Sequence, residues 1–184
     1  MIRLASSSQT RAMLLRDADV EFIQESVDFD EDSIIATSPK NFVYQATLGK
    51  YEANLKAFGC EEYPLLVADT VVTSQNQILR KAKCVDEARN ILMTQSGNIT
   101  SIVTCMIYQT PKMKLIDISQ TDYIFDSFNL DDLDRYLASG EWRGKAGACM
   151  VEGFCKSYIK EVRGYESTAM GLNVEVLKSF YVSV

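Results

Sequence analysis

The chain carries, at residues 65–72, the run Leu65-Leu66-Val67-Ala68-Asp69-Thr70-Val71-Val72. A short and nearly continuous apolar run, rich in β-branched residues, is typical of a central strand that is buried in its sheet. Strands of this kind lie in sheets whose faces are covered by helices. The run therefore predicts the centre of an α/β fold.

Apolar periodicity on either side of this run predicts interleaved strands and helices. Strands are expected at residues 2–6, 20–26, 99–109, 114–128 and 154–162, and helices at residues 8–17, 39–58, 86–95, 131–138 and 168–180. Residues 78–83 are expected to form a connector, and residues 140–153 a loop punctuated by glycines. The sequence thus predicts one α/β domain over residues 1–184, with a mixed, twisted central sheet and flanking helices.

Asp69 interrupts the apolar run, and this position is unusual for a charged residue. Carboxylates are seldom buried without partners. A partly buried carboxylate that is held by a cation or by hydrogen-bond donors is a common arrangement for a general base or a metal ligand. The structural alternative is an aspartate at a strand end that only caps a turn.

The charge and hydropathy of the chain argue against several kinds of partner. Its formal net charge is −6, which disfavours the broad basic surface that a nucleic acid polymer or an anionic membrane selects. We find no apolar stretch long enough for a membrane span and no signal-peptide pattern at the N-terminus. We therefore expect a cytoplasmic protein that binds no membrane and no nucleic acid polymer.

The chain contains no histidine, which restricts its chemistry further. Ser-His-Asp triads, Cys-His dyads and histidine-rich zinc sites are excluded, unless another subunit supplies the ring. The base of any hydrolytic reaction is then expected to be a carboxylate, a lysine or a tyrosine. Any metal is expected to be a hard cation on oxygen ligands, such as Mg²⁺ or Mn²⁺.

The cysteines predict neither a disulfide framework nor a zinc cluster. Their number is odd and they form no C-x-x-C pair. We expect buried or incidental thiols at Cys60, Cys84, Cys105, Cys149 and Cys155.

The N-terminal run Leu4-Ala5-Ser6-Ser7-Ser8-Gln9-Thr10-Arg11 predicts a short strand that ends in hydroxyl residues and opens a helix. A helix start offers unpaired N–H donors and the positive end of the helix dipole, which suits a phosphate. Arg11 adds a charge that does not titrate. The structural alternative is an ordinary serine-capped helix.

Three lysines and one acidic segment add further candidates. Lys50 falls on a stripe of apolar residues in the predicted helix (Phe42, Ala46, Ala53 and Ala57), so it is expected to face a negative group or to extend its ammonium to water. Lys81 lies in a basic connector. Lys145 lies among small residues that lack the spacing of a phosphate-binding P-loop. The acidic residues 28–32 favour a solvated loop or a metal-binding carboxylate.

Three of these segments together resemble the Maf family, the septum-formation-associated nucleoside triphosphate pyrophosphatases. Their order and spacing hold over nearly the whole chain. The matching motifs are Leu4-Ala5-Ser6-Ser7-Ser8 with Arg11, Ala68-Asp69-Thr70-Val71-Val72, and Lys145-Ala146-Gly147-Ala148 followed by Glu152-Gly153.

This resemblance implies a fold of two lobes around a nucleotide cleft, a divalent cation and a homodimer. It also implies hydrolysis of a nucleoside triphosphate between the α and β phosphates, in the manner of a house-cleaning enzyme that removes non-standard nucleotides. Asp69 resembles the residue that activates water, and Glu31 and Asp69 resemble metal ligands. The implied substrate contacts are Ser6, Ser8, Arg11, Lys50 and Lys81 on the triphosphate, Lys145 as a further cation, and Glu152 on the base or sugar.

The chain departs from the family pattern in two places that bear on function. Gln9-Thr10-Arg11 stands where the family has Pro-Arg-Arg, which removes one cation. Glu152 resembles the branch that acts on 7-methylated guanosine triphosphate, whereas many members active on pyrimidine nucleotides have glutamine in this region, so the preferred base stays open. The lost cation also leaves open a nucleotide-binding regulator of cell division or septum formation that needs no turnover.

Overall fold

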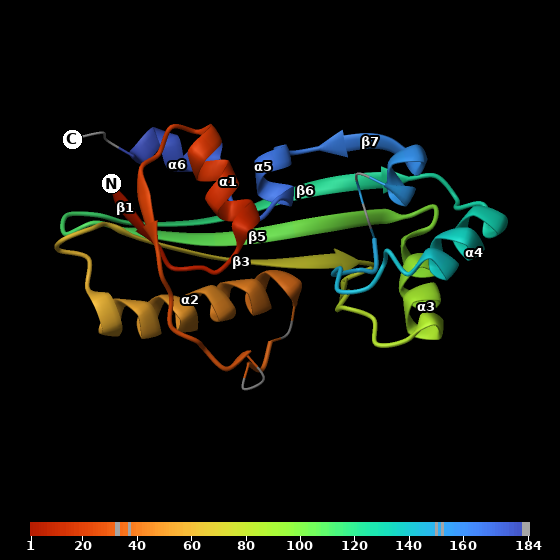
Figure 1. Cartoon of the computed structure of the whole chain (residues 1–184), viewed down its shortest axis with the longest axis horizontal. Helices are drawn as coiled ribbons and strands as arrows, with labels where there is room; N and C mark the ends of the chain where they lie inside the picture. The colour runs from red at the N-terminus through yellow and green to blue at the C-terminus, as the bar shows by residue number, and fades with distance from the viewer. Residues whose placement is uncertain (32–33, 37, 150, 152, 182–184) are drawn as a thin grey trace. The chain divides into compact units, whose positions relative to one another are not determined.

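The computed structural model describes residues 1–31, 34–36, 38–149, 151 and 153–181, and its strands and helices are interleaved along the chain (Figure 1). The strands are β1 (Ile2–Leu4), β2 (Phe22–Gln24), β3 (Leu65–Ser74), β4 (Gln77–Ile78), β5 (Ile99–Gln109), β6 (Lys114–Phe125) and β7 (Ile159–Arg163). The helices are α1 (Gln9–Asp17), α2 (Pro39–Phe58), α3 (Val85–Gln95), α4 (Leu130–Ser139), α5 (Glu166–Ala169) and α6 (Val174–Phe180), with a 3₁₀ helix, η2, at Phe154–Tyr158.

Over the described residues the strands form a seven-stranded mixed sheet in the order β2-β1-β3-β5-β6-β7, with β4 paired to β3. The strand β1 is parallel to both of its neighbours, with Leu4 opposite Gln24 of β2 and Leu66 of β3. The pairs β3–β4 and β6–β7 are antiparallel. The predicted α/β class, with a mixed sheet and flanking helices, is confirmed.

The chain divides into two compact units, which we call the first and the second unit. The first unit comprises Met1–Thr70, Val103–Gln120 and Tyr165–Val184, and the second comprises Val71–Ile102 and Thr121–Gly164. The single domain over residues 1–184 and the nucleotide cleft that the family resemblance implies both stay predictions.

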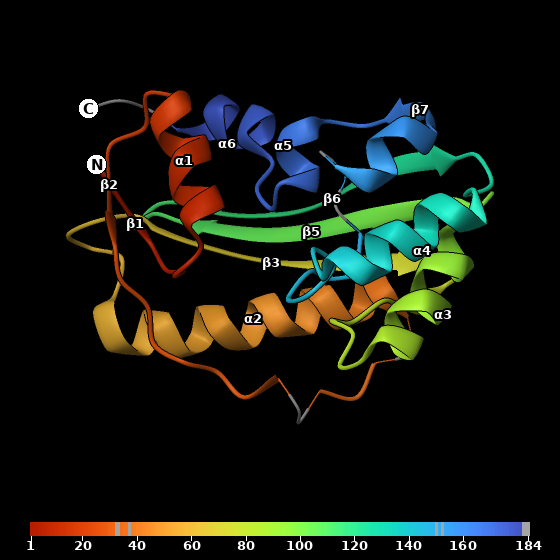
Figure 2. The ribbon, with the colours of Figure 1, turned by 45° about the vertical axis from the view of Figure 1, so that its right-hand side comes forward.

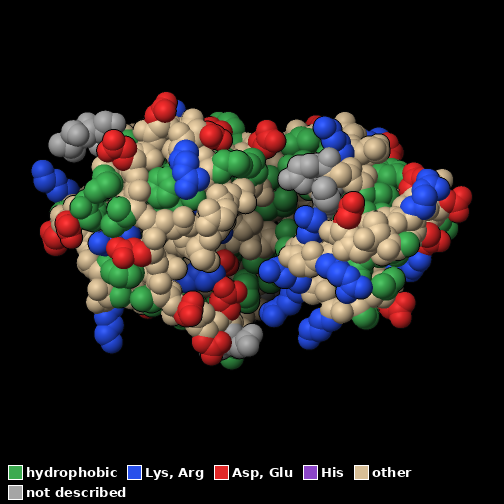
Figure 3. Space-filling model, in the orientation of Figure 1, with side chains coloured by type: hydrophobic (Ala, Val, Ile, Leu, Met, Phe, Trp, Pro, Cys, Tyr) green, Lys and Arg blue, Asp and Glu red, His purple; other side chains and the backbone are tan. Residues whose placement is uncertain are grey.

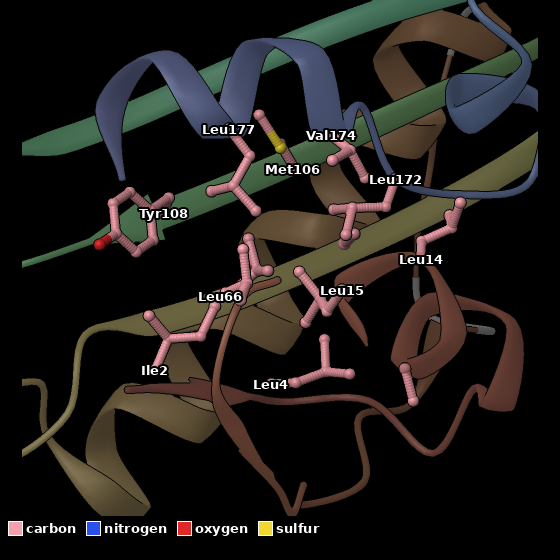
Figure 4. Close-up of a cluster of buried hydrophobic side chains, with 13 residues drawn as sticks. Ile2, Leu4, Leu14, Leu15, Leu66, Met106, Tyr108, Leu172, Val174 and Leu177 are labelled. Carbon is pink, nitrogen blue, oxygen red and sulfur yellow. The ribbon is translucent and has the colours of Figure 1, made fainter. Parts of the chain in front are cut away.

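In the first unit, β3 is buried from both sides, which explains its apolar sequence. Leu66 and Ala68 pack into a cluster with α1 and α6, whereas Leu65 and Val67 pack against α2. Figure 2 shows α2 on one side of the sheet and α1 and α6 on the other. The first cluster is drawn in Figure 4, with Ile2, Leu4, Leu14, Leu15, Leu66, Met106, Tyr108, Leu172, Val174 and Leu177 labelled.

In the second unit, aromatic side chains account for much of the packing. Trp142 is buried and donates its indole N–H to the Leu137 carbonyl over 3.0 Å. The Phe128 ring lies 5.2 Å from the Phe154 ring and 5.0 Å from the Tyr158 ring, centroid to centroid. These contacts explain why the strand predicted at residues 154–162 is wrong over its first half: residues 154–158 form η2, and the strand begins at Ile159.

The helix predicted at residues 168–180 is also wrong as a single element. Two helices, α5 and α6, replace it, because Gly171 has a φ of +106°, which a helix does not allow. Asn173 then starts α6 by accepting a hydrogen bond from the Val176 N–H over 3.1 Å. Of the remaining predicted elements, β5 and α2 have the predicted bounds, and the others are present with shifted ends; β1, β2 and β6 in particular are shorter than predicted.

The expectation of free thiols is wrong for one pair of cysteines. Cys149 and Cys155 are joined as a disulfide, with their Cα atoms 6.3 Å apart. Cys155 lies in η2, and the spacing of the two cysteines alone does not reveal that they pair. Cys60 and Cys105 are buried free thiols, and Cys84 is an exposed one. Burial raises the pKa of Cys105 to about 11.

Acidic and basic side chains are interspersed on the face shown in Figure 3, in line with a formal net charge of −6. Among the described helices, none combines the length and the apolar character needed to cross a membrane.

Candidate active site

A cavity of about 300 Å³ lies in the first unit, beside the residues that follow β1 and β2. In open α/β sheets, ligands bind beyond the carboxyl ends of the parallel strands, and both of these segments leave such ends. The lining residues are Ala5, Ser6, Ser7, Ser8, Arg11, Ser26, Val27, Asp28, Phe29, Glu31, Lys50, Asn54 and Ala68.

The serine segment after β1 has the geometry that its sequence predicts. Ser8 is the N-cap of α1, and its hydroxyl oxygen accepts the Arg11 backbone N–H over 3.3 Å. The Ser6 hydroxyl oxygen accepts the Ser8 backbone N–H over 3.2 Å. Gln24 donates its amide N–H groups to the Ser6 and Ser8 carbonyls over 2.7 and 3.3 Å, which ties the segment to β2. Ser8 is therefore both a helix cap and a lining residue of the cavity.

The Arg11 side chain is held by three acceptors. Its Nε donates to the Gly171 carbonyl over 2.8 Å, one terminal nitrogen to the Ser6 hydroxyl over 3.0 Å, and the other to the Thr70 hydroxyl over 3.2 Å. Burial lowers the pKa of Arg11, and the negative charges of Asp69 and Glu31 oppose that shift. Because a guanidinium has five N–H donors, one N–H on each terminal nitrogen lies beyond these three bonds.

Lys50, from the middle of α2, joins two carboxylates. Its Nζ lies 2.6 Å from Asp69 Oδ1 and 2.5 Å from Glu31 Oε1. Asp69 is 8% exposed, so its partner ammonium compensates a charge that is largely removed from water. The prediction that Lys50 faces a negative group is confirmed.

The apolar stripe predicted for the helix around Lys50 is only partly buried. Ala46 is buried as expected, but Ala57 is exposed. The buried positions of α2 are Pro39, Val43, Ala46, Thr47, Tyr51 and Asn54. Lys50 lies at the edge of this buried face, from which its long stem reaches the carboxylates.

Two contacts that the sequence did not predict hold residues 25–31 against α2. The Val27 backbone N–H donates to Asn54 Oδ1 over 3.0 Å, while Asn54 Nδ2 donates to the Lys50 carbonyl over 2.7 Å. A Cβ on Gly49 would lie 2.2 Å from the Phe29 ring, so the absent side chain makes room for that ring. A glycine within a helix and a buried asparagine were the available signals.

The two carboxylates around Lys50 are too few to hold a divalent cation alone, but they suit one that is also bound by the phosphates of a substrate. Over the described residues, no group of three or more His, Cys, Asp or Glu side chains could hold a metal ion. Glu31 and Asp69 nevertheless converge on one point, the Lys50 ammonium. Mg²⁺ is typically bound by one or two carboxylates together with substrate phosphates and water, so these two residues fit it.

The other predicted substrate residues belong to the second unit or lie outside the described residues. Lys81 forms an isolated β-bridge with Ala146, next to Lys145. The Gly147 backbone N–H donates to the Leu79 and Arg80 carbonyls, each over 3.2 Å, so the two lysine-bearing segments lie side by side. Glu152 is outside the described residues.

The model of the family described as Maf-like protein matches residues 1–182. The chain belongs to the Maf family. A nucleoside triphosphate pyrophosphatase of a Nitratiruptor species is 57% identical over 179 residues, which cover 96% of each chain.

Two relatives from other organisms carry the same name. The nucleoside triphosphate pyrophosphatase of Helicobacter pylori (strain J99 / ATCC 700824) is 38% identical over 174 residues, which cover 95% of this chain and 91% of the relative. The one of Campylobacter jejuni subsp. jejuni serotype O:23/36 (strain 81-176) is 36% identical over 182 residues, which cover 98% and 100% of the two chains. The likeness to these three relatives therefore extends over at least 91% of each chain.

Proposed function

We propose that this Maf-family protein is a nucleoside triphosphate pyrophosphatase. It hydrolyses the α–β phosphoanhydride of ribo- and deoxyribonucleoside triphosphates to the monophosphate and pyrophosphate, and serves as a house-cleaning enzyme against non-standard or modified nucleotides. The proposal rests on one observation: Lys50 forms ion pairs with Asp69 and Glu31 beside a cavity that Ser6 and Ser8 line. The names of the three relatives support it.

The charges around the cavity support a triphosphate that arrives with a divalent cation. Arg11, Lys50 and the start of α1 attract the phosphates, whereas Glu31 and Asp28 repel them. We propose that Glu31 and Asp69 hold Mg²⁺ or Mn²⁺, which when bound neutralises charge on the phosphates and on the departing pyrophosphate. The cation would thus offset the repulsion between these carboxylates and an anionic substrate.

In the proposed reaction, Asp69 is the general base. It accepts a proton from the water molecule whose oxygen attacks the α-phosphorus. The bond from the α-phosphorus to the bridging oxygen breaks, and pyrophosphate leaves with the electron pair. Arg11 and Lys50 stabilise the charge that develops on this leaving group. A carboxylate base agrees with a chain that contains no histidine.

The remaining assignments rest on the family resemblance. Ser6 and Ser8 are proposed phosphate ligands, and Lys81, Lys145 and Glu152 are proposed as additional substrate contacts. A cytoplasmic location and a homodimer are proposed on the same ground. Light scattering on the purified protein tests the dimer.

The test is a panel of canonical and modified nucleoside triphosphates, with 7-methylguanosine triphosphate included, incubated with Mg²⁺ or Mn²⁺. We expect pyrophosphate as the first product, and we expect Asp69→Asn to abolish turnover without loss of the fold. Asp122→Asn is the matched control, because Asp122 is also a hydrogen-bonded strand carboxylate, paired with the Ser101 hydroxyl. Orthophosphate as the first product would contradict the proposal.

A second candidate is a nucleotide-binding regulator of cell division that needs no turnover. Thr10, which stands at the position of a family arginine, favours it. This candidate requires that Asp69→Asn keeps both nucleotide binding and any division phenotype. Loss of the phenotype in that variant would exclude it.

A further inference from the structure

A chain of hydroxyl groups lies behind the Arg11 guanidinium. Arg11 donates to Thr70 Oγ1 over 3.2 Å, and Thr70 Oγ1 lies 2.9 Å from Thr104 Oγ1. Thr104 Oγ1 in turn lies 2.8 Å from the Thr168 carbonyl oxygen. All four residues belong to the first unit, and Thr104 is buried.

The chemistry of the two ends orients every proton in this chain. A carbonyl oxygen only accepts, so the single hydroxyl proton of Thr104 points to Thr168. The Thr104 oxygen must then accept the hydroxyl proton of Thr70. A guanidinium only donates, so the Thr70 oxygen accepts from Arg11. Thr104 therefore determines which side of the Thr70 oxygen faces the arginine.

We propose that Thr70 and Thr104 are positioning residues that hold the Arg11 guanidinium in the orientation that binds a polyphosphate. This inference rests on the proposed function. The guanidinium donates hydrogen bonds from its three nitrogens to Thr70, Ser6 and the Gly171 carbonyl, so its plane is fixed before the substrate binds. This fixed orientation matters because a small displacement of a substrate-binding group removes a large part of its contribution to binding and catalysis.

Packing alone does not explain these hydroxyls. A strand accommodates valine at least as well as threonine, and a buried hydroxyl costs free energy unless it is bonded. Thr73, on the same strand as Thr70, is buried with a hydroxyl oxygen that has no hydrogen-bond partner within the described residues. A threonine on β3 thus does not need a bonded hydroxyl for the strand to form.

The test compares Thr104→Val with Thr104→Ser and with the control Thr73→Val. Thr104→Val keeps the shape of the side chain but removes the acceptor of the Thr70 hydroxyl proton, so the Thr70 oxygen is free to turn away from Arg11. The dissociation constant for inorganic tripolyphosphate with Mg²⁺, measured by calorimetry, is expected to rise about tenfold, as for the loss of the hydrogen bond between Thr70 and the charged Arg11. kcat/KM for the nucleotide is expected to fall by at least the same factor, because Arg11 is proposed to contact the phosphates both when the nucleotide binds and when pyrophosphate leaves. Thr104→Ser keeps the hydroxyl and restores both values, and Thr73→Val leaves them unchanged.

The outcomes separate this inference from the proposed function. The proposed function is refuted if the wild-type protein binds tripolyphosphate but releases no pyrophosphate from any nucleotide. In that case the tripolyphosphate dissociation constants of the variants still test the role of Thr70 and Thr104. Thr104→Val with wild-type affinity, or Thr104→Ser with the same loss as Thr104→Val, overturns the inference. If Thr104→Val does not fold, Thr70→Val and Thr70→Ser provide the same comparison at the half-buried partner.

Discussion

Lys50 offers the sharpest test of the site, because replacing it by methionine removes one charge from between two carboxylates. The Lys50 Nζ is 2.6 Å from Asp69 Oδ1 and 2.5 Å from Glu31 Oε1, so Coulomb's law at an effective dielectric constant of about 20 gives roughly 6 kcal/mol for each pair. Desolvation and solvent screening offset most of this attraction, since the Glu31 side chain is 42% exposed.

We expect Lys50→Met to lower the free energy of unfolding by about 2 kcal/mol, because Glu31 and Asp69 then repel each other without a cation. This corresponds to a decrease in Tm of about 4–8 °C. The same repulsion makes the pair a better site for a divalent cation. We therefore expect Mn²⁺, titrated by electron paramagnetic resonance without nucleotide, to bind about tenfold more tightly and to restore the lost stability.

Lys56→Met is the control, because Lys56 is an exposed residue of the same helix; its expected effect on stability is under about 0.5 kcal/mol. Pyrophosphate release by Lys50→Met is expected to fall even when Mn²⁺ saturates the protein, since a phosphate contact is lost. A Lys50→Met protein with wild-type stability and unchanged or weaker Mn²⁺ affinity would refute the reasoning.

Three further predictions concern other parts of the first and second units. In Gly171→Ala, the new Cβ lies 3.3 Å from Thr70 Oγ1 at a φ of +106°, so chemical denaturation is expected to show a loss of about 1–3 kcal/mol; a neutral effect would show that this turn adapts freely. Burial raises the pKa of Cys105 to about 11, so the folded thiol stays neutral where the unfolded one ionises. The contribution of Cys105 to stability is expected to be constant below about pH 8.5 and to fall as the pH rises toward 11, and a Cys105→Ala protein with the same decline would contradict this. Wild-type protein treated with iodoacetamide under native conditions is expected to be labelled at the exposed Cys84 before Cys60 or Cys105, whereas early labelling of Cys105, followed by mass spectrometry, would count against its burial.

Features that depend on neighbours in sequence could be predicted. The apolar run around Leu66 forms the central strand, and Ser8 caps the helix that follows β1, because burial pattern and capping act within a few residues. A carboxylate partner for Lys50 was one of the two alternatives that the sequence left open, and the ion pair with Asp69 decides between them.

Features that depend on distant residues could not be predicted. Arg11 is anchored by Thr70 and Gly171, which lie 59 and 160 positions away in the sequence. No local pattern indicates those partners. Phe154 and Tyr158 alternate like strand residues, yet aromatic packing with Phe128 determines their conformation. The spacing of Cys149 and Cys155 likewise does not indicate that they pair.

The division of the chain also has a consequence for how the protein is made. The first unit draws on Met1–Thr70, Val103–Gln120 and Tyr165–Val184, so it lacks its last segment until Tyr165–Val184 has been translated. The second unit, by contrast, has all of its residues once Gly164 has left the ribosome. Because compact units fold as their residues emerge, the half of the protein that holds Arg11, Lys50 and Asp69 is completed last. A nascent chain that stalls before its C-terminal helices would therefore lack the Gly171 carbonyl that anchors Arg11.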